Sequence, residues 1–286
     1  MATKILVTGA DGQLGSCLRE IAPQCGGCVF VFTDVDGLDV TDREAAAQFM
    51  ERERPQWVIN TAAYTAVDKA EGDPEAARRL NADAVGILAT ESERVGASLL
   101  HISTDYVFGG SNPEPLTEEE PADPQSVYGR TKLEGERAAI KGNPRSVVIR
   151  TSWLYSVYGN NFVKTMLRIG AERDQVNVVG DQWGSPTSAH DLAAAIMRVV
   201  DKPRYGLYHY SNLGTASWAL FAEQIMGLAG LNCRVNHLTT AEYPTVARRP
   251  AFSIMDKGRF MTTFVVKIAE WESALEEVID RLAGFA

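Results

Sequence analysis

The feature that most constrains the fold is the alternation of short apolar runs with helical segments over the first 155 residues. Apolar runs occupy residues 4–9, 28–34, 57–63, 97–104 and 146–155, and helical patterns occupy residues 12–22, 42–55, 74–96 and 127–140. Strands that are apolar throughout are buried on both faces, as in a parallel sheet. We therefore expect an α/β fold in which helices cover both faces of a parallel sheet.

Charge and composition exclude several functions. The formal net charge of −9 argues against general attraction to nucleic acids. No apolar run approaches the roughly 18 to 20 residues that span a bilayer, and the first residues contain no cleavage signal, so we expect a cytoplasmic protein without membrane contacts. The four cysteines contain one C-x-x-C pair without a second, and the four histidines are scattered, so we expect no metal site.

The first strand ends in a glycine-rich turn. In "VTGADGQLG", Gly9, Gly12 and Gly15 separate a predicted strand from a predicted helix. Glycine permits the tight turn and the close approach of a pyrophosphate, which the helix N-terminus favours through its free N–H groups. The G-x-x-G-x-x-G spacing resembles that of the extended short-chain dehydrogenase/reductases, and we expect a Rossmann-type, doubly wound fold.

Asp34 ends the second predicted strand, about 20 residues beyond the glycines. A carboxylate at this position accepts hydrogen bonds from both ribose hydroxyls of NAD and repels the 2′-phosphate of NADP. No arginine follows until Arg43, so this residue alone favours NADH. A simple turn role for Asp34 is the alternative.

Tyr128 and Lys132 lie four residues apart in "YGRTK" and therefore share one face of a predicted helix. Free tyrosine has a pKa of about 10, too high for efficient acid–base chemistry at neutral pH. We expect the ammonium of Lys132 to favour the phenolate and to lower this pKa.

A closer resemblance rests on seven segments. These are "TAAYTAVDKAE", "STDYVFGG", "VYGRTKLEGE", "RTSWLY", "NNFVKTMLR", "DQWGSPT" and "YPTVARRP". Together they resemble the dTDP-4-dehydrorhamnose reductases, which reduce the C4 ketone of dTDP-4-dehydro-L-rhamnose with NADPH or NADH. The resemblance implies an NAD(P)-binding domain at residues 1–152. It also implies a smaller, mainly substrate-binding domain at residues 153–286, with some segments returning to the sheet.

The resemblance also implies roles for individual residues. Tyr128 would donate the proton, Lys132 would hold the nicotinamide ribose, and Thr104 at a strand end would position the tyrosine or the sugar oxygen. The implied cofactor contacts are Gly9, Asp11, Gly12, Gln13, Leu14, Gly15, Asp34, Asp39, Val40, Ala62, Ala63, Tyr64, Tyr128 and Lys132. The implied contacts to the dTDP-sugar are Thr104, Asp105, Tyr106, Trp153, Arg248 and Arg249. Trp153 would offer a flat face to the sugar, with a core aromatic as the alternative.

Three alternative functions share this fold, and the sequence disfavours the first of them, dehydration. A sugar-nucleotide 4,6-dehydratase shares the Tyr/Lys pair but carries Asp-Glu after the threonine, whereas this chain has Asp105-Tyr106. A 4-epimerase would retain its cofactor through purification. A non-catalytic subunit similar to the β subunit of methionine adenosyltransferase would bind the cofactor without turnover. Some relatives form dimers, so a homodimer is possible.

Overall fold

The computed structural model describes residues 2–284, and its centre is one sheet of six parallel strands. The strands are β1 (Thr3–Thr8), β2 (Cys28–Thr33), β3 (Trp57–Asn60), β4 (Ser98–Thr104), β5 (Ser146–Thr151) and β10 (Gly206–His209), in the spatial order β10-β5-β4-β3-β1-β2. The order reverses between β1 and β3, which is the switch point where open α/β sheets bind ligands. The predicted doubly wound, Rossmann-type fold is confirmed.

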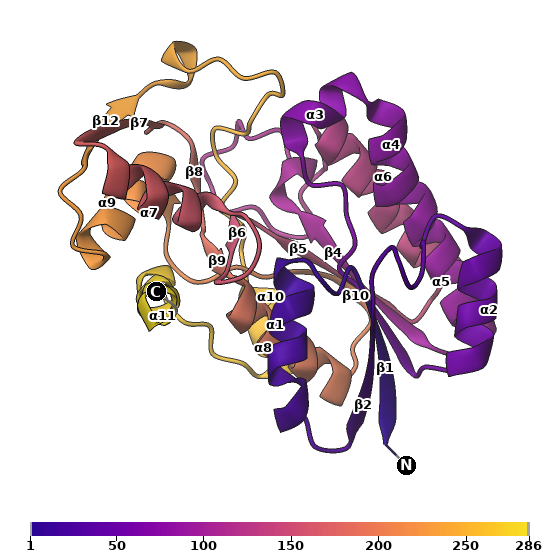
Figure 1. Ribbon diagram of the computed structural model, residues 1–286. Helices are drawn as coiled ribbons and strands as arrows, with labels where there is room; N and C mark the ends of the chain where they lie inside the picture. The colour runs from indigo at the N-terminus through magenta and orange to yellow at the C-terminus, as the bar shows by residue number, and fades with distance from the viewer. Residues whose placement is uncertain (1, 285–286) are drawn as a thin grey trace.

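Helices cover both faces of this sheet because successive strand residues point to opposite sides (Figure 1). One face packs against α2 (Arg43–Glu53), α5 (Ala84–Arg94) and α6 (Val127–Gly142). The other packs against α1 (Gln13–Ile21), α8 (Ala189–Asp201) and α10 (Gly258–Phe264). The second half of the chain thus contributes one strand, β10, to the central sheet and two helices, α8 and α10, to the layer that covers it.

Side-chain caps explain where several helices begin. Asp42 accepts hydrogen bonds from the N–H groups of Glu44 and Ala45 at the start of α2. Asp73 caps α4 (Pro74–Arg78), and Ser126 accepts a hydrogen bond from Gly129 N at the start of α6. These caps satisfy N–H groups that have no partner within the helix. The predicted helix start at Asp73-Pro74 is confirmed.

A second hydrophobic core lies beside the sheet. It is built around Phe221 and Trp271 and includes residues of α7 (Phe162–Glu172), α9 (Trp218–Leu228) and α11 (Trp271–Gly284). Three short strand pairs accompany it: β6 (Leu154–Tyr155) with β9 (Thr187–Ser188), β7 (Gln175–Val179) with β12 (Arg234–Leu238), and β8 (Trp183–Gly184) with β11 (Ala216–Ser217). In Figure 1 these elements lie to the left of the central sheet, with α11 below α7 and α9.

Two predicted elements are interrupted in the structure. The predicted strand at residues 146–155 is divided into β5 and β6, because Trp153 has a φ of +48°, outside the strand region. The predicted helix at residues 74–96 contains a π-helical turn, η2 (Arg79–Asp83), between α4 and α5. An additional short helix, α3 (Val67–Gly72), precedes it. Within residues 2–284, the helices are too short or too polar to cross a bilayer.

Candidate active site

A groove follows the carboxyl ends of the central strands, where the switch point lies. Two adjoining pockets of about 510 Å³ each form it, and both are lined by Gly12, Thr61 and Ala63. We name them the Asp34 pocket and the Tyr128 pocket after one residue in each. A third pocket of about 390 Å³, the Arg249 pocket, shares Trp218 with the Tyr128 pocket.

The structure distributes the predicted site residues over these pockets. Gly9, Asp11, Gly12, Asp34, Asp39, Val40, Ala62, Ala63 and Tyr64 line the Asp34 pocket. Gly12, Gln13, Leu14, Ala63, Thr104, Asp105, Tyr106, Tyr128, Lys132 and Trp153 line the Tyr128 pocket. Arg249 lines the Arg249 pocket, whereas Gly15 and Arg248 are absent from the lining of all three pockets among the described residues.

The glycine turn packs too closely for side chains. Gly9 has a φ of +67°, and a Cβ on it would lie 2.5 Å from the backbone nitrogen of Ala62, just after β3. A Cβ on Gly15 would lie 2.5 Å from the carbonyl oxygen of Gly9. Gly15 therefore lets α1 pack against the turn without lining a pocket. The backbone N–H groups of Ala10, Asp11 and Gly12 are hydrogen-bonded within the protein. The glycine turn thus brings a pyrophosphate close to the first N–H groups of α1, which have no side-chain cap, and we call this arrangement the glycine cradle.

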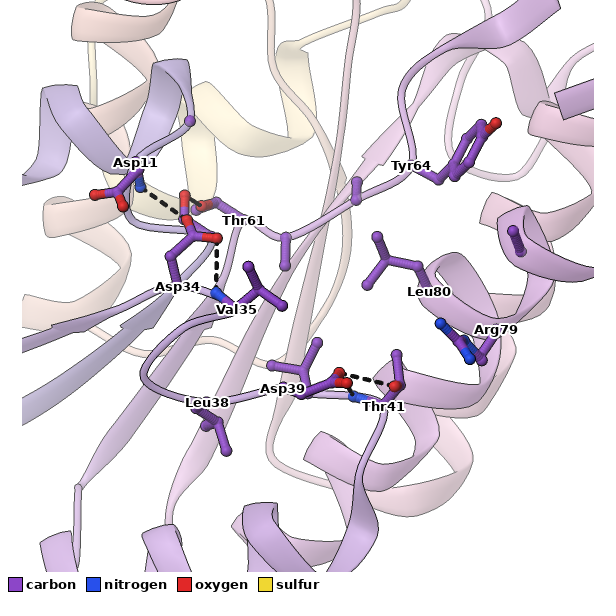
Figure 2. A pocket seen from close by; sticks show the side chains of 16 residues that line it. Asp11, Asp34, Val35, Leu38, Asp39, Thr41, Thr61, Tyr64, Arg79 and Leu80 are labelled. Atoms are coloured by element: carbon purple, nitrogen blue, oxygen red, sulfur yellow. Dashed lines mark hydrogen bonds between the residues drawn. The ribbon is translucent and has the colours of Figure 1, made fainter. Parts of the chain in front are cut away.

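Two carboxylates fix the loop around the Asp34 pocket (Figure 2). Asp34 accepts hydrogen bonds from the backbone N–H of Asp11 at 3.0 Å and of Val35 at 2.8 Å. Asp39 accepts two from Thr41, and these bonds lower the pKa of Asp39 below its usual value. Because each carboxylate oxygen can accept more than one hydrogen bond, both side chains can still bind hydroxyl or amino groups of an adenosine.

Arg79 was not predicted from the sequence, yet it lines the Asp34 pocket opposite Asp39 (Figure 2). Among the described residues that line this pocket, Arg79 is the one with a cationic side chain. Arg79 begins the π-helical turn η2, and such turns are frequent at functional sites. In the same turn, the Asn81 side chain accepts a hydrogen bond from the backbone N–H of Tyr64 and donates one to its carbonyl oxygen. The turn therefore fixes the loop that lines both pockets.

The Tyr128 pocket contains a buried carboxylate next to the strand-terminal hydroxyl. Thr104, the last residue of β4, donates a hydrogen bond to Asp105 Oδ1 at 2.9 Å. Asp105 Oδ2 is buried without a hydrogen-bond partner in the structure. Burial raises the pKa of Asp105 to about 6. The Ser253 side chain lies close enough to oppose this rise, although it forms no well-aligned hydrogen bond with Oδ2. Oδ2 can therefore still accept a hydrogen bond from a ligand hydroxyl.

The pKa of Tyr128 shifts opposite to the expected direction. Burial raises it to about 12, the Asp105 carboxylate adds to the increase, and a hydrogen bond with the Thr104 side chain opposes it. The Tyr106 ring packs edge-on against the Tyr128 ring, with 5.4 Å between their centroids. The phenol is therefore protonated at neutral pH, as a proton donor must be, but the higher pKa makes it a weaker acid than free tyrosine.

Lys132 lies deep in the same pocket and is 2% exposed. Its amine donates a hydrogen bond to the carbonyl oxygen of Ile102 at 2.6 Å. Burial lowers the pKa of Lys132 to about 8, with Glu136 opposing the shift. The amine can therefore change its protonation state close to neutral pH, although the expected lowering of the tyrosine pKa by Lys132 does not appear.

Two stacked tryptophans form the wall between the Tyr128 and Arg249 pockets. The rings of Trp153 and Trp218 are parallel, with centroids 3.6 Å apart. Trp218 starts α9 and lines both pockets. A side chain at Gly184 would collide with the Trp153 indole. One face of Trp153 is therefore covered by Trp218, so Trp153 combines an aromatic packing role with a place in the pocket wall.

The two predicted arginines have different surroundings. Arg249 forms a two-point ion pair with Asp68 at 2.6 and 3.0 Å, and the guanidinium is partly buried. This pair joins α3 to the loop before α10. Arg248 is exposed and donates to Gln125 at 3.3 Å. The structure thus brings Arg249, but not Arg248, to a pocket.

The fold and this site together define a dinucleotide-binding oxidoreductase of the extended short-chain dehydrogenase/reductase class. A glycine cradle at the switch point adjoins a pocket with Thr104, Tyr128 and Lys132. Comparison with known proteins narrows the assignment to a family.

A family model described as "RmlD substrate binding domain" matches residues 3–283. A dTDP-4-dehydrorhamnose reductase of Sinorhizobium fredii is 39% identical over 288 residues, covering 96% of each chain. The crystal structure of a dTDP-4-dehydrorhamnose reductase from Clostridium acetobutylicum has a TM-score of 0.95 and 42% identity, covering 98% of this chain and 100% of that one. That of a Bacillus anthracis dTDP-4-dehydrorhamnose reductase in complex with NADP also has a TM-score of 0.95, with 38% identity and the same coverage. This chain belongs to the dTDP-4-dehydrorhamnose reductase family.

Proposed function

We propose that this protein reduces the C4 ketone of dTDP-4-dehydro-L-rhamnose to dTDP-L-rhamnose in dTDP-rhamnose biosynthesis, with NADPH or NADH as the reductant. The observation that carries this proposal is the meeting of Thr104, Tyr128 and Lys132 in one pocket beside the glycine cradle. Family membership supports the reaction, and the NADP complex of the Bacillus anthracis relative supports the cofactor.

The residues along the groove fit a dinucleotide. Gly9, Gly12 and the N-terminus of α1 would hold the pyrophosphate, and Asp34 would hold the adenosine ribose. When bound, the reduced nicotinamide supplies the hydride that C4 of the sugar accepts. Lys132 would hold the ribose hydroxyls on the nicotinamide side through its amine.

Tyr128 is the proposed proton donor to the C4 oxygen. Its hydroxyl is protonated at neutral pH and can give its proton to the C4 oxygen when hydride transfer makes that oxygen basic. Thr104 would orient the phenol or the sugar oxygen, since its side chain hydrogen-bonds Tyr128. Thr104, Asp105 and Lys132 are buried in this pocket, and low polarity around them strengthens their polar contacts.

The proposed sugar contacts follow from the same pocket. Asp105 would accept a hydrogen bond from a sugar hydroxyl through its unpartnered Oδ2. Tyr106 and Trp153 would shape the pocket around the ring. The nucleotide would continue past the tryptophan wall into the Arg249 pocket, where the guanidinium, already paired with Asp68, would offer its remaining N–H groups. In this arrangement the cofactor lies against residues 1–152, whereas the substrate lies against both parts of the chain, so a substrate-binding domain at residues 153–286 stays a prediction.

Dehydration and epimerisation are less well supported. Tyr106, which stands where dehydratases carry glutamate, packs its ring on Tyr128 and supplies no carboxylate. An epimerase would retain its cofactor through purification, whereas a reductase exchanges it in every turnover. The proposed co-substrates suggest a cytoplasmic location, and a homodimer remains a prediction.

The test is a coupled assay with dTDP-4-dehydro-6-deoxyglucose, the 3,5-epimerase and NADPH or NADH. We expect loss of the reduced-nicotinamide absorbance together with formation of dTDP-L-rhamnose. No oxidation of either cofactor would refute the reductase function. Oxidation without dTDP-L-rhamnose would refute the assigned product.

A further inference from the structure

A row of three buried polar side chains crosses the sheet beneath Lys132. Thr8, Asn60 and His101 are register partners on β1, β3 and β4, and each is at most 1% exposed. Thr8 donates to Asn60 Oδ1 at 2.8 Å, and the Asn60 amide nitrogen lies 3.1 Å from His101 Nδ1. His101 Nε2 lies 3.5 Å from the Lys132 amine.

The surroundings of Asn60 fix the orientation of its amide. The backbone N–H of Ala62 donates to Asn60 Oδ1 at 3.2 Å. A backbone N–H can only donate, so this end of the amide is the oxygen. The opposite end is therefore the NH₂ group, and it donates to His101 Nδ1.

This orientation also fixes where His101 carries its proton. Nδ1 must be unprotonated because it accepts a hydrogen bond from Asn60. Burial holds the pKa of His101 well below its ordinary value, so the ring is neutral. The single ring proton is therefore on Nε2, the nitrogen that faces the Lys132 amine.

We propose that His101 is a positioning residue of this active site, whose Nε2–H faces the Lys132 amine and favours the neutral form of that amine. An ammonium has only donors and cannot accept a hydrogen bond from Nε2–H. A neutral amine can accept it with its lone pair while still donating to the Ile102 carbonyl oxygen.

The other titratable groups on the elements packed against Lys132 do not favour the neutral form of its amine in the way that His101 does. Asp105 follows β4, and Tyr128 and Glu136 lie one turn to either side of Lys132 on α6. Glu136 favours the ammonium, but both its oxygens also accept hydrogen bonds from Arg150. Burial lowers the pKa of Lys132 to about 8 against the effect of Glu136, and the facing Nε2–H would act in the same direction as burial.

The consequence for catalysis rests on the proposed function. When Tyr128 gives its O–H proton to the sugar oxygen, a phenolate remains and must regain a proton from a nearby acid. A Lys132 amine that titrates near neutral pH can supply that proton and then take one up from solvent. His101 would stabilise the neutral amine left after the transfer.

The first test measures the tautomer in ligand-free protein and does not depend on turnover. We expect the ¹⁵N spectrum of histidine-labelled protein, assigned with His101→Leu, to show an unprotonated Nδ1 and a protonated Nε2 for His101 at pH 7. A proton on Nδ1, or a charged ring, would overturn the proposal. A failed reductase assay would leave this result unchanged.

The second test follows Lys132 by ¹³C NMR of lysine-labelled protein, assigned with Lys132→Met. His101→Leu should raise the titration midpoint of Lys132 by about 0.5 to 1 pH unit, as expected for the loss of one hydrogen-bonding contact. Thr8→Val is the matched control, since it removes a buried hydroxyl while Ala62 still orients Asn60. Its midpoint should be unchanged.

A midpoint that stays constant or falls in His101→Leu would overturn the proposal. An equal rise in Thr8→Val would also overturn it, because the effect would then come from general loosening. Should His101→Leu fail to fold, the tautomer of the unmodified protein, assigned through His101→Gln, decides the question.

Discussion

Gly9→Ala offers the sharpest test of the glycine cradle, because the structure predicts two separate costs. A non-glycine residue at a φ of +67° is disfavoured by about 1–2 kcal/mol. The new Cβ would also lie 2.5 Å from the nitrogen of Ala62, which forces the β1–α1 turn away from β3. Overpacking of this kind costs a further 1–3 kcal/mol or so.

Gly96→Ala is the matched control. Gly96 has a similar φ of +80°, but a Cβ there meets no atom within 4 Å in the described part of the chain. It should therefore show only the conformational cost of about 1–2 kcal/mol. At roughly 2–4 °C per kcal/mol for a chain of this size, the two variants should differ in Tm by several degrees.

The assay combines thermal unfolding with NADPH titration followed by fluorescence. Gly9→Ala should weaken NADPH binding by at least about tenfold because it displaces the turn. A tenfold rise in Kd corresponds to a loss of about 1.4 kcal/mol of binding free energy. Gly96→Ala should leave the Kd unchanged. Equal Tm and equal Kd in the two variants would refute the close-packing argument.

Two further predictions concern charged groups in the groove. Because burial raises the folded-state pKa of Asp105 above its unfolded value, its contribution to stability is greatest below about pH 4 and is lost as pH rises through about 6. Asp105→Asn should therefore raise the Tm of the ligand-free protein at pH 8 relative to the unmodified chain while weakening binding of the dTDP-sugar; a lower Tm at pH 8 would contradict the pKa shift. Arg79→Leu should raise the Kd for NADPH more than the Kd for NADH. Among the described residues lining the Asp34 pocket, Arg79 is the cation that could bind the 2′-phosphate of NADPH. Equal effects on both cofactors, measured by the same fluorescence titration, would show that Arg79 does not contact the phosphate.

The sequence was most informative where a local pattern determines the structure. The glycine turn, the strand ending at Thr104 and the helix carrying Tyr128 and Lys132 are each set by neighbouring residues. Their side chains converge because parallel strands place their carboxyl ends at one edge of the sheet. Chain order and spacing, together with the resemblance that singled out Thr104, therefore predicted which of these residues would meet.

The features that were not predicted depend on tertiary structure. Arg79 faces the pocket from a π-helical turn that the periodicity of a regular helix does not indicate. Trp218 reaches the tryptophan wall from a distant part of the chain. The pKa of Tyr128 was expected to fall beside Lys132, but burial dominates and raises it. Burial and distant contacts of this kind leave no short pattern in the sequence.

The most direct test of the central claim is the turnover of Tyr128→Phe with dTDP-4-dehydro-L-rhamnose and NADPH. Removing the hydroxyl while keeping the ring should lower kcat by about 10² to 10⁴, the range expected for loss of a general acid. The Kd for NADPH should stay within about twofold, because the phenol is assigned to proton transfer. A kcat equal to that of the unmodified enzyme would contradict the assignment of Tyr128 as the proton donor.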